Sequence, residues 1–272
     1  MSDPVIAEVW RDGVLESFHT GVWAVSDPDG NILWSGGDID RPIFVRSCAK
    51  PFQALPLVMT GAADAYGITD QELACICASH NSEPVHLEVV RSILAKIGLD
   101  ESCLQCGGHA PSKNRIAFEY VQNGERFTDI HNNCSGKHAG ILALSLFIGA
   151  DPSTYKETDH PAEVMIRQAY AAVSGLDPAT IRTGHDGCDI PAFVTTTRVF
   201  ARAAARFARP ESIGDPEMAR AIARVTNAII KYPYMLGGME RFCTDLAREA
   251  KGRAIGKRSE EHTSELQSRQ SI

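Results

Sequence analysis

The hydrophobic period of this chain changes once, near residue 47, and this change constrains the fold more than any other feature. Before it, residues 5–46 alternate apolar and polar side chains, with strong turn signals at Asp12-Gly13 and at Asp27-Pro28-Asp29-Gly30-Asn31. Two hairpins of an antiparallel meander are predicted there. After it, apolar residues recur at i, i+3 and i+4, as in amphipathic helices. The pattern therefore predicts an α+β fold with an N-terminal antiparallel sheet and a helical body.

The helical part divides into segments separated by polar loops. Predicted helices cover residues 51–60, 70–77, 85–97, 137–148, 161–174, 192–208, 217–230 and 240–249. Thr158 and Asp159 are the candidate N-caps of the helix at 161–174. We expect one catalytic domain over residues 1–257.

Composition narrows the class of protein. A chain of 272 residues that is 44% hydrophobic can bury a large core, and its net charge of -7 with scattered Lys and Arg argues against nucleic acid as a partner. No basic segment precedes an apolar stretch near Met1, and no window approaches about eighteen apolar residues. Eight cysteines are too few for a disulfide scaffold of this length. We therefore expect reduced thiols, no membrane partner and a cytoplasmic location.

The last residues differ in character from the rest. The stretch from Arg258 to Ser268 is polar, has no hydrophobic period and looks like the in-frame translation of a sequencing-library adapter. We interpret residues 258–272 as a non-native tail, the alternative being a natural disordered tail, and exclude them from fold reasoning. The native sequence is then expected to stop near Lys257, which makes the domain incomplete at its C-terminus.

A serine and a lysine stand three residues apart where the period changes. Ser47 follows an apolar, strand-like run, and Lys50 precedes Pro51, which is tolerated only in the first turn of a helix. The spacing places both side chains on one face of a helix N-terminus, where backbone N–H groups can stabilise an oxyanion. A neutral lysine could remove the serine proton. Ser-x-x-Lys also occurs by chance, with a capping serine and a solvated lysine as the alternative.

Three polar loops add candidate chemistry. The segment 78–86 gathers Ser, His, Asn and Glu side chains before a helix, which is typical of a functional loop or of an elaborate helix cap. The segments 131–138 and 183–189 each hold one cysteine among His, Asp and Gly, and two thiolates, one nitrogen and a water would suit zinc. Spacing alone leaves the nitrogen open, and buried thiols are the alternative. The candidates are His131, His138, His185 and Lys137. Cys103-x-x-Cys106 lacks a partner pair and is not predicted to be a site.

Four strings in this order resemble one family over residues 5–257. They are Arg46-Ser-Cys-Ala-Lys-Pro51, Ser79-His-Asn-Ser-Glu-Pro84, His131-Asn-Asn-Cys-Ser-Gly-Lys-His-Ala139 and Asp186-Gly-Cys-Asp-Ile-Pro191. They look like the rhizobial-type, class 3 L-asparaginases, also called the thermolabile type II group. The resemblance implies a fold similar to the serine β-lactamases and penicillin-binding proteins, a homodimer, and hydrolysis of asparagine to aspartate and ammonia.

The resemblance also implies roles for individual residues. Ser47 with Lys50 would form one Ser-Lys pair, and Ser79 would belong to a second pair whose lysine lies near the C-terminus. The positions that match residues lining the substrate pocket are Arg46, His138 and Asp186. Those that match ligands of one zinc ion, with water in the fourth place, are Cys134, Lys137 and Cys188. An amine must lose a proton to bind metal, so such a site should weaken as the pH falls.

The chain departs from the family pattern at the second lysine. In the family that lysine opens a segment reading Lys, any residue, Gly-Ala-Glu-Gly, followed by further strands and a helix. Here Ala254-Ile-Gly-Lys257 resembles the approach to it, so Lys257 is the candidate, and two close lysines would each disfavour the other's charge. Without the closing strands we expect an uncovered sheet edge, poor stability, no activity and a Lys257 amine that stays protonated at neutral pH.

These observations predict an asparagine amidohydrolase that works through an acyl-enzyme on Ser47 or Ser79, with zinc modulating it. The order in which the serines act is left open. The alternatives are a glutaminase, a β-lactam-reactive hydrolase, and a zinc-binding protein without catalysis.

Overall fold

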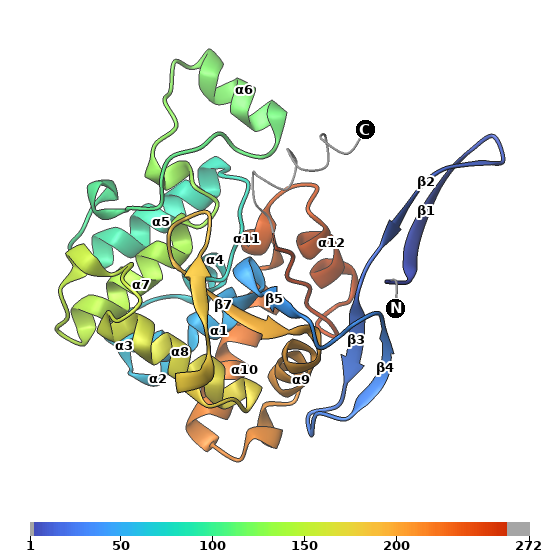
Figure 1. Ribbon diagram of the computed structural model, residues 1–272. Helices are drawn as coiled ribbons and strands as arrows, with labels where there is room; N and C mark the ends of the chain where they lie inside the picture. The colour runs from blue at the N-terminus through green and yellow to red at the C-terminus, as the bar shows by residue number, and fades with distance from the viewer. Residues whose placement is uncertain (1–2, 260–272) are drawn as a thin grey trace.

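A computed structural model describes residues 3–259 and has an α+β architecture, which confirms that prediction (Figure 1). The strands form three small antiparallel sheets. They pair β1 (Val5–Arg11) with β2 (Val14–Thr20), β3 (Trp23–Ser26) with β4 (Ile32–Gly36), and β7 (Pro191–Thr196) with both β5 (Pro42–Phe44) and β6 (Thr183–His185). Of the tail predicted at 258–272, all but Arg258 and Ser259 lies outside the described residues.

Both N-terminal hairpins turn where the sequence predicted. Asp12 and Gly13 have φ values of 46° and 80°, the left-handed backbone that a two-residue hairpin turn needs. The Asp27 carboxylate accepts hydrogen bonds from the backbone N–H groups of Gly30 and Asn31, each at 2.9 Å. Local turn chemistry therefore determines both hairpins.

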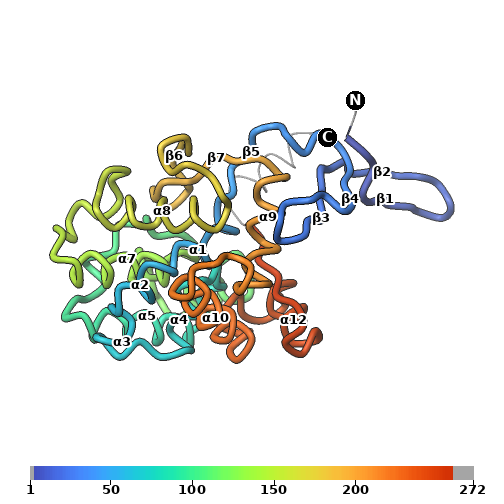
Figure 2. The backbone as a smooth tube through the Cα atoms, turned by 90° about the horizontal axis from the view of Figure 1, so that it is seen from below, coloured from blue at the N-terminus to red at the C-terminus, as the bar shows by residue number. Residues whose placement is uncertain are grey.

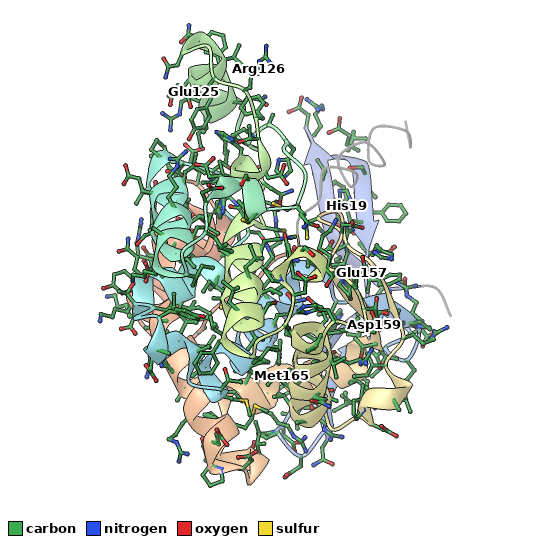
Figure 3. The ribbon with its side chains drawn as sticks, turned by 90° about the vertical axis from the view of Figure 1, so that its left-hand side faces the viewer. His19, Glu125, Arg126, Glu157, Asp159 and Met165 are labelled. Atoms are coloured by element: carbon green, nitrogen blue, oxygen red, sulfur yellow. The ribbon has the colours of Figure 1, made fainter. Side chains whose placement is uncertain are left out.

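The prediction of one continuous meander was wrong for residues 3–259. The hairpins form separate two-stranded sheets, and Gly21 N, which donates to Pro4 O at 3.1 Å, extends the pairing of β1 with β2. Every residue of β1 and β2 is exposed, and the hairpin projects from the body with His19 on it (Figures 1 and 3). β5 pairs instead with β7, about 150 residues later, with Ile43 opposite Thr195. β3 packs against helix α9 (Figure 2).

Twelve α-helices make up the body in residues 3–259. They are α1 (Lys50–Gln53), α2 (Leu55–Met59), α3 (Ala62–Ala65), α4 (Asp70–Ile76), α5 (Pro84–Lys96), α6 (Asn114–Gln122), α7 (Ser135–Phe147), α8 (Pro161–Ser174), α9 (Thr197–Ala208), α10 (Pro216–Lys231), α11 (Pro233–Gly237) and α12 (Phe242–Glu249). The sequence pattern missed α3, α6 and α11. Helix α6 protrudes at one end, where Glu125 and Arg126 follow it (Figure 3).

Two helix predictions needed correction. The segment predicted as a helix at 192–208 begins as strand β7, because its β-branched residues Val194, Thr195 and Thr196 suit a strand, and only α9 is helical. Helix α8 is capped by His160, whose side chain accepts a hydrogen bond from Ala162 N at 3.2 Å. Thr158 and Asp159 do not cap it, and Asp159 is exposed (Figure 3).

Helix α7 runs through the core, and its residues 135–145 are all buried. It packs against α4, α5 and α8. Two glycines allow it to approach α4 closely. A Cβ at Gly136 would overlap the carbonyl oxygen of Cys75, and one at Gly140 would lie 2.7 Å from Ile76 Cγ2. The N-terminus of α7 is therefore held against the end of α4.

Within the described part of the chain, no helix is both long enough and apolar enough to span a bilayer.

Candidate active site

The first serine and lysine lie where β5 turns into the helical body. Arg46 has a left-handed φ of 51°, a conformation that is strained for a residue with a side chain. It opens a 3-10 turn over Arg46–Ala49, and α1 begins at Lys50 with Pro51 in its first turn, as predicted. The side chains of Ser47 and Lys50 are both buried, with 1% of each residue exposed. Buried groups of this kind need partners, which the next loop supplies in part.

The Lys50 amine reaches the loop that follows α4. Its Nζ donates to the carbonyl oxygen of Ala78 and to Ser79 Oγ, the latter at 3.1 Å. The expected pairing of Lys50 with Ser47 does not appear as a hydrogen bond, because the amine extends past the first helical turn toward these acceptors. Ser47 Oγ is buried and has no hydrogen-bond partner within residues 3–259. The hydroxyl of Ser47 is thus left available at the start of the helix.

The loop of residues 79–83 is buried throughout and is tied to α11. Ser79 N donates to Leu236 O at 3.1 Å, and Asn81 N donates to Gly237 O at 2.9 Å. Arg241, which the sequence reasoning missed, donates to Ser79 O at 3.3 Å and to Asn81 Oδ1 at 3.1 Å. The polar composition of the loop was the available signal, whereas nothing in the sequence around Arg241 pointed to this role.

Lys257 lies on the other side of Ser79. Its Nζ donates to Ser79 Oγ at 2.7 Å, so one serine oxygen contacts two lysine amines. Burial, and next the cation of Lys50, lower the pKa of Lys257 to about 7. The amine was expected to stay mostly protonated at neutral pH, whereas a pKa of about 7 leaves it about half protonated there. The pKa is lowered because the chain up to Ser259 folds back over the site: Cys48 Sγ donates to Lys257 O at 3.0 Å, and Arg258 N to Cys243 Sγ at 3.1 Å.

The two loop cysteines meet next to this cluster. Cys134 caps α7, Lys137 lies in its first turn, and Cys188 follows β6; all three are buried. Lys137 Nζ donates to Cys188 Sγ at 2.9 Å. A hydrogen bond from Cys134 and the Lys137 cation lower the pKa of Cys188 to about 5, despite the opposing effect of burial. The same hydrogen bond, between Cys134 and Cys188, and burial raise the pKa of the Cys134 thiol. The neighbouring Lys137 amine and Cys134 thiol therefore both favour the ionised form of Cys188.

The donor set fits zinc only if the lysine takes part. Within residues 3–259, no three His, Cys, Asp or Glu side chains are grouped to hold a metal ion. Two sulfur atoms and one amine do converge, and zinc prefers sulfur and nitrogen ligands. Among the nitrogens left open by the sequence, His131 is bonded to Thr128 and the side chain of His185 is 70% exposed beside Asp189. His138 Nδ1 is paired with the Tyr155 hydroxyl, so Lys137 is the one of these four candidates that is hydrogen-bonded to a cysteine sulfur.

The positions expected to line a substrate pocket surround these groups. Arg46 Nε lies 3.6 Å from Asp186 Oδ1, and Lys137 Nζ lies 4.0 Å from Asp186 Oδ2. Burial tends to raise the pKa of Asp186, but Lys137, the N–H of Gly187 and the cations of Lys50 and Arg46 hold it below its ordinary value. Burial and the Lys137 charge lower the pKa of His138 to about 3, so its ring is neutral.

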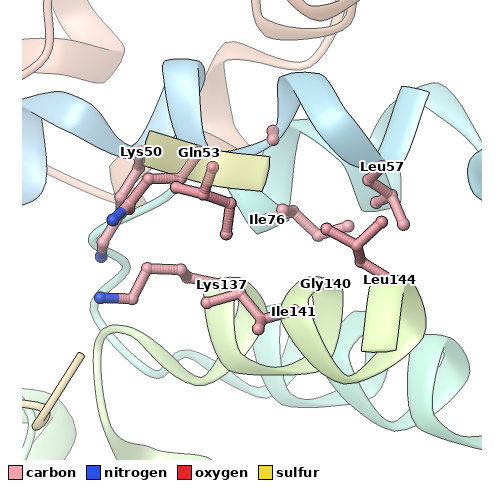
Figure 4. Close-up of a pocket in the computed structure, with 10 residues that line it drawn as sticks. Lys50, Gln53, Leu57, Ile76, Lys137, Gly140, Ile141 and Leu144 are labelled. Atoms are coloured by element: carbon pink, nitrogen blue, oxygen red, sulfur yellow. The ribbon is translucent and has the colours of Figure 1, made fainter. Parts of the chain in front are cut away.

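Lys50 and Lys137 also meet across a small cavity. Its volume is about 10 Å³, room for roughly one water molecule, and apolar side chains of α2, α4, α7 and α8 form most of its wall. Figure 4 shows the two amines at one end of the cavity and Gln53 beside them. The Ser79 cluster and the cysteine cluster are thus parts of one buried polar centre.

The fold and the site define an α+β protein with serine hydroxyls and lysine amines concentrated in one centre. Comparison with protein families gives a match to the family model for L-asparaginase II over residues 7–265. The chain belongs to the L-asparaginase II family, and the recognition made from its motifs is confirmed. No curated protein matches it. The family supports amidohydrolase activity on a small-molecule substrate, asparagine.

Proposed function

We propose that this protein hydrolyses L-asparagine by a Ser-Lys mechanism in which Ser47 attacks and Ser79 relays protons. One observation carries the proposal: Ser79 Oγ lies between Lys50 Nζ, at 3.1 Å, and Lys257 Nζ, at 2.7 Å. A hydroxyl can accept one hydrogen bond while donating its own proton to another group. Ser79 can therefore accept from Lys50 and donate to neutral Lys257. Because both lysines reach Ser79 within residues 3–259, we propose that the chain is active, in place of the inactivity expected without the closing strands.

This chain of groups accounts for the protons of the first step. Ser47 Oγ forms a bond to the side-chain amide carbon of asparagine, and its proton moves to Lys50 as Lys50 passes one proton to Ser79 and Ser79 passes one to Lys257. The reverse transfer delivers a proton to the departing ammonia as the C–N bond breaks. Water then attacks the ester on Ser47, releasing aspartate. Ser47 Oγ has no hydrogen-bond partner within residues 3–259, and we propose that it meets Lys50 when substrate is bound, since contacts to a nucleophile are often completed only then.

Substrate recognition follows from the two charged groups beside the serines. Asparagine carries an α-carboxylate and an α-ammonium, and Arg46 and Asp186 supply one charge of each sign. Their separation of 3.6 Å allows them to pair with each other before substrate enters and with the substrate afterwards. Glutamine has the same two groups, so the choice of asparagine must come from the distance between these charges and Ser47.

The same constellation supports the fold relationship implied by the resemblance. Serine β-lactamases and penicillin-binding proteins combine Ser-x-x-Lys, a second serine motif and a later lysine. Here the corresponding groups are Ser47-x-x-Lys50, Ser79-x-Asn81 and Lys257, and they meet in one place. We propose that the small antiparallel sheets and helical body are a variant of that fold.

Zinc is part of the proposal as a modulator. Cys134, Lys137 and Cys188 would hold it, and bound zinc would fix the N-terminus of α7 and the loop after β6, which carry His138 and Asp186. All eight cysteines are free thiols in the structure, which supports the proposed cytoplasmic location. A homodimer, as the resemblance implies, completes the proposal and is measurable by light scattering.

The test is to find the acylated serine. We would quench the enzyme with acid during turnover of asparagine, digest it, and locate the aspartyl ester by mass spectrometry. We expect the ester on Ser47. Ser47→Ala should release no ammonia, whereas the buried control Ser145→Ala should release it at the normal rate. An ester on Ser79 would refute the assigned roles, and turnover without either serine would refute the mechanism.

A further inference from the structure

The hydroxyl of Tyr155 joins two parts of the site that the proposed mechanism does not use. Tyr155 follows the short 3-10 turn Pro152–Thr154 and is completely buried. Gln105 N donates to its Oη at 2.9 Å, and the same Oη lies 2.7 Å from His138 Nδ1. The phenol therefore links the loop before α6 to the first turn of α7.

The directions of these hydrogen bonds follow from the donors present. A backbone N–H can only donate, so Oη accepts from Gln105. The phenol proton then needs an acceptor, and His138 Nδ1 is the other partner of Oη in the described part of the chain. If Nδ1 carried a hydrogen, the phenol proton would be left without an acceptor at a fully buried position, which folded proteins avoid. Nδ1 must therefore accept.

The tautomer of His138 follows from this arrangement. A neutral imidazole with an accepting Nδ1 carries its hydrogen on Nε2. His138 Nε2 is buried and has no hydrogen-bond partner among residues 3–259. A buried N–H without a partner, one residue from Lys137 and within electrostatic reach of Lys50, needs an acceptor that the protein itself does not provide. An oxygen of a bound substrate would be such an acceptor.

We propose that Tyr155 is a positioning residue that holds His138 as the Nε2–H tautomer, so that Nε2 donates a hydrogen bond to an oxygen atom of the bound amino acid. The phenol O–H donates its one hydrogen to His138 Nδ1, and the hydrogen bond from the Gln105 N–H keeps the phenol from turning away. This inference rests on the proposed function for the identity of the acceptor, whereas the tautomer itself follows from the protein alone.

The experiment combines ¹⁵N NMR of the histidine rings with kinetics on the full chain. Loss of one set of ring signals in His138→Gln assigns them. In the wild type, His138 should show a hydrogen-bearing Nε2 and an accepting Nδ1. Tyr155→Phe removes one oxygen, so the Nδ1–H tautomer should appear and kcat/KM for asparagine should fall about tenfold, the effect of one hydrogen bond. Tyr170→Phe, which removes the hydroxyl of another fully buried tyrosine packed between Phe52 and Phe193, should change neither.

Two results would overturn the inference. One is a wild-type His138 with hydrogen on Nδ1, which is decided without any variant and so does not depend on how Tyr155→Phe folds. The other is a folded Tyr155→Phe protein that keeps both the tautomer and the wild-type kcat/KM. Failure of the proposed function is distinguishable, because a wild type without asparagine turnover would leave the tautomer measurement unaffected.

Discussion

Replacing Lys257 by methionine should abolish turnover and at the same time stabilise the protein. The amine contacts Ser79 Oγ at 2.7 Å and is the proton acceptor of the proposed relay, so its loss removes the chemical step. Its pKa of about 7 also means that folding places an ionisable group where its charged form is disfavoured. Methionine has a similar length and carries no charge, and it avoids this cost.

The size of the effect depends on pH in a defined direction. An unfolded lysine has a pKa of about 10.4, so between that value and about 7 the unfolded chain binds more protons than the folded one, and stability rises with pH. With these two values, Lys257 destabilises the fold by roughly 4–5 kcal/mol near pH 6 and by roughly 2 kcal/mol near pH 9. The stability advantage of Lys257→Met should therefore shrink by roughly 2–3 kcal/mol over that range.

Urea unfolding of both proteins at several pH values measures this difference. Leu246→Met, on α12 beside Gly256, introduces the same side chain nearby without removing a titrating group, and its stability difference from wild type should not vary with pH. In parallel, kcat/KM of the wild type should rise with pH through about 7 as Lys257 loses its proton. A pH-independent advantage for Lys257→Met would show that the amine is not depressed by the fold, and the relay would lose its acceptor.

Three further predictions test other parts of the site. Ser47→Ala should remove asparagine hydrolysis, while Cys48→Ala, which removes a sulfur that contacts the carbonyl oxygen of Lys257, should keep kcat within a few fold in an ammonia-release assay. About one zinc should bind per chain, as measured by metal analysis, and Cys134→Ser or Cys188→Ser should lose it and raise KM more than they lower kcat; full substrate affinity without zinc would contradict this. Asp186→Asn should raise KM for asparagine at least tenfold with a smaller change in kcat, because it removes one full charge at the site of the substrate ammonium; an unchanged KM would exclude that role.

Local rules predicted the parts of the fold that depend on short segments. The two hairpin turns follow from Asp-Gly and Asp-Pro-Asp-Gly-Asn, and the long helices α5, α7, α8 and α10 follow from their apolar period. The pairing of β5 with β7 was not predictable in this way, because a strand partner about 150 residues away is chosen by packing of the whole body. The whole segment 192–208 was likewise predicted to be a helix, although β7 occupies its first part, because the pairing that makes it a strand also depends on distant residues.

In the candidate site, too, short segments predicted the residues, whereas only the fold determines most of their contacts. The residues to examine were recognisable as motifs, because Ser, Lys, Cys and His stand at short spacings beside helix starts. Their spacing did not reveal which of them touch, although the family resemblance paired Ser79 with Lys257 and grouped Lys137 with Cys188. Lys50 contacts Ser79 rather than Ser47, since a long side chain reaches past its own turn to a buried carbonyl oxygen. Arg241 and Tyr155 lie outside every motif, and only the fold brings them to the site.

The glycine contact between α7 and α4 has a consequence for how this sequence can vary. Gly136 lies against the carbonyl oxygen of Cys75, four residues before Ser79, and is itself one residue from Lys137. A methyl group there would push the backbones apart, and so would separate the cysteine cluster from the serine cluster in a single step. We therefore expect a library of random variants selected for asparagine turnover to retain glycine at position 136 almost without exception, while the exposed hairpin of β1 and β2 accumulates substitutions freely.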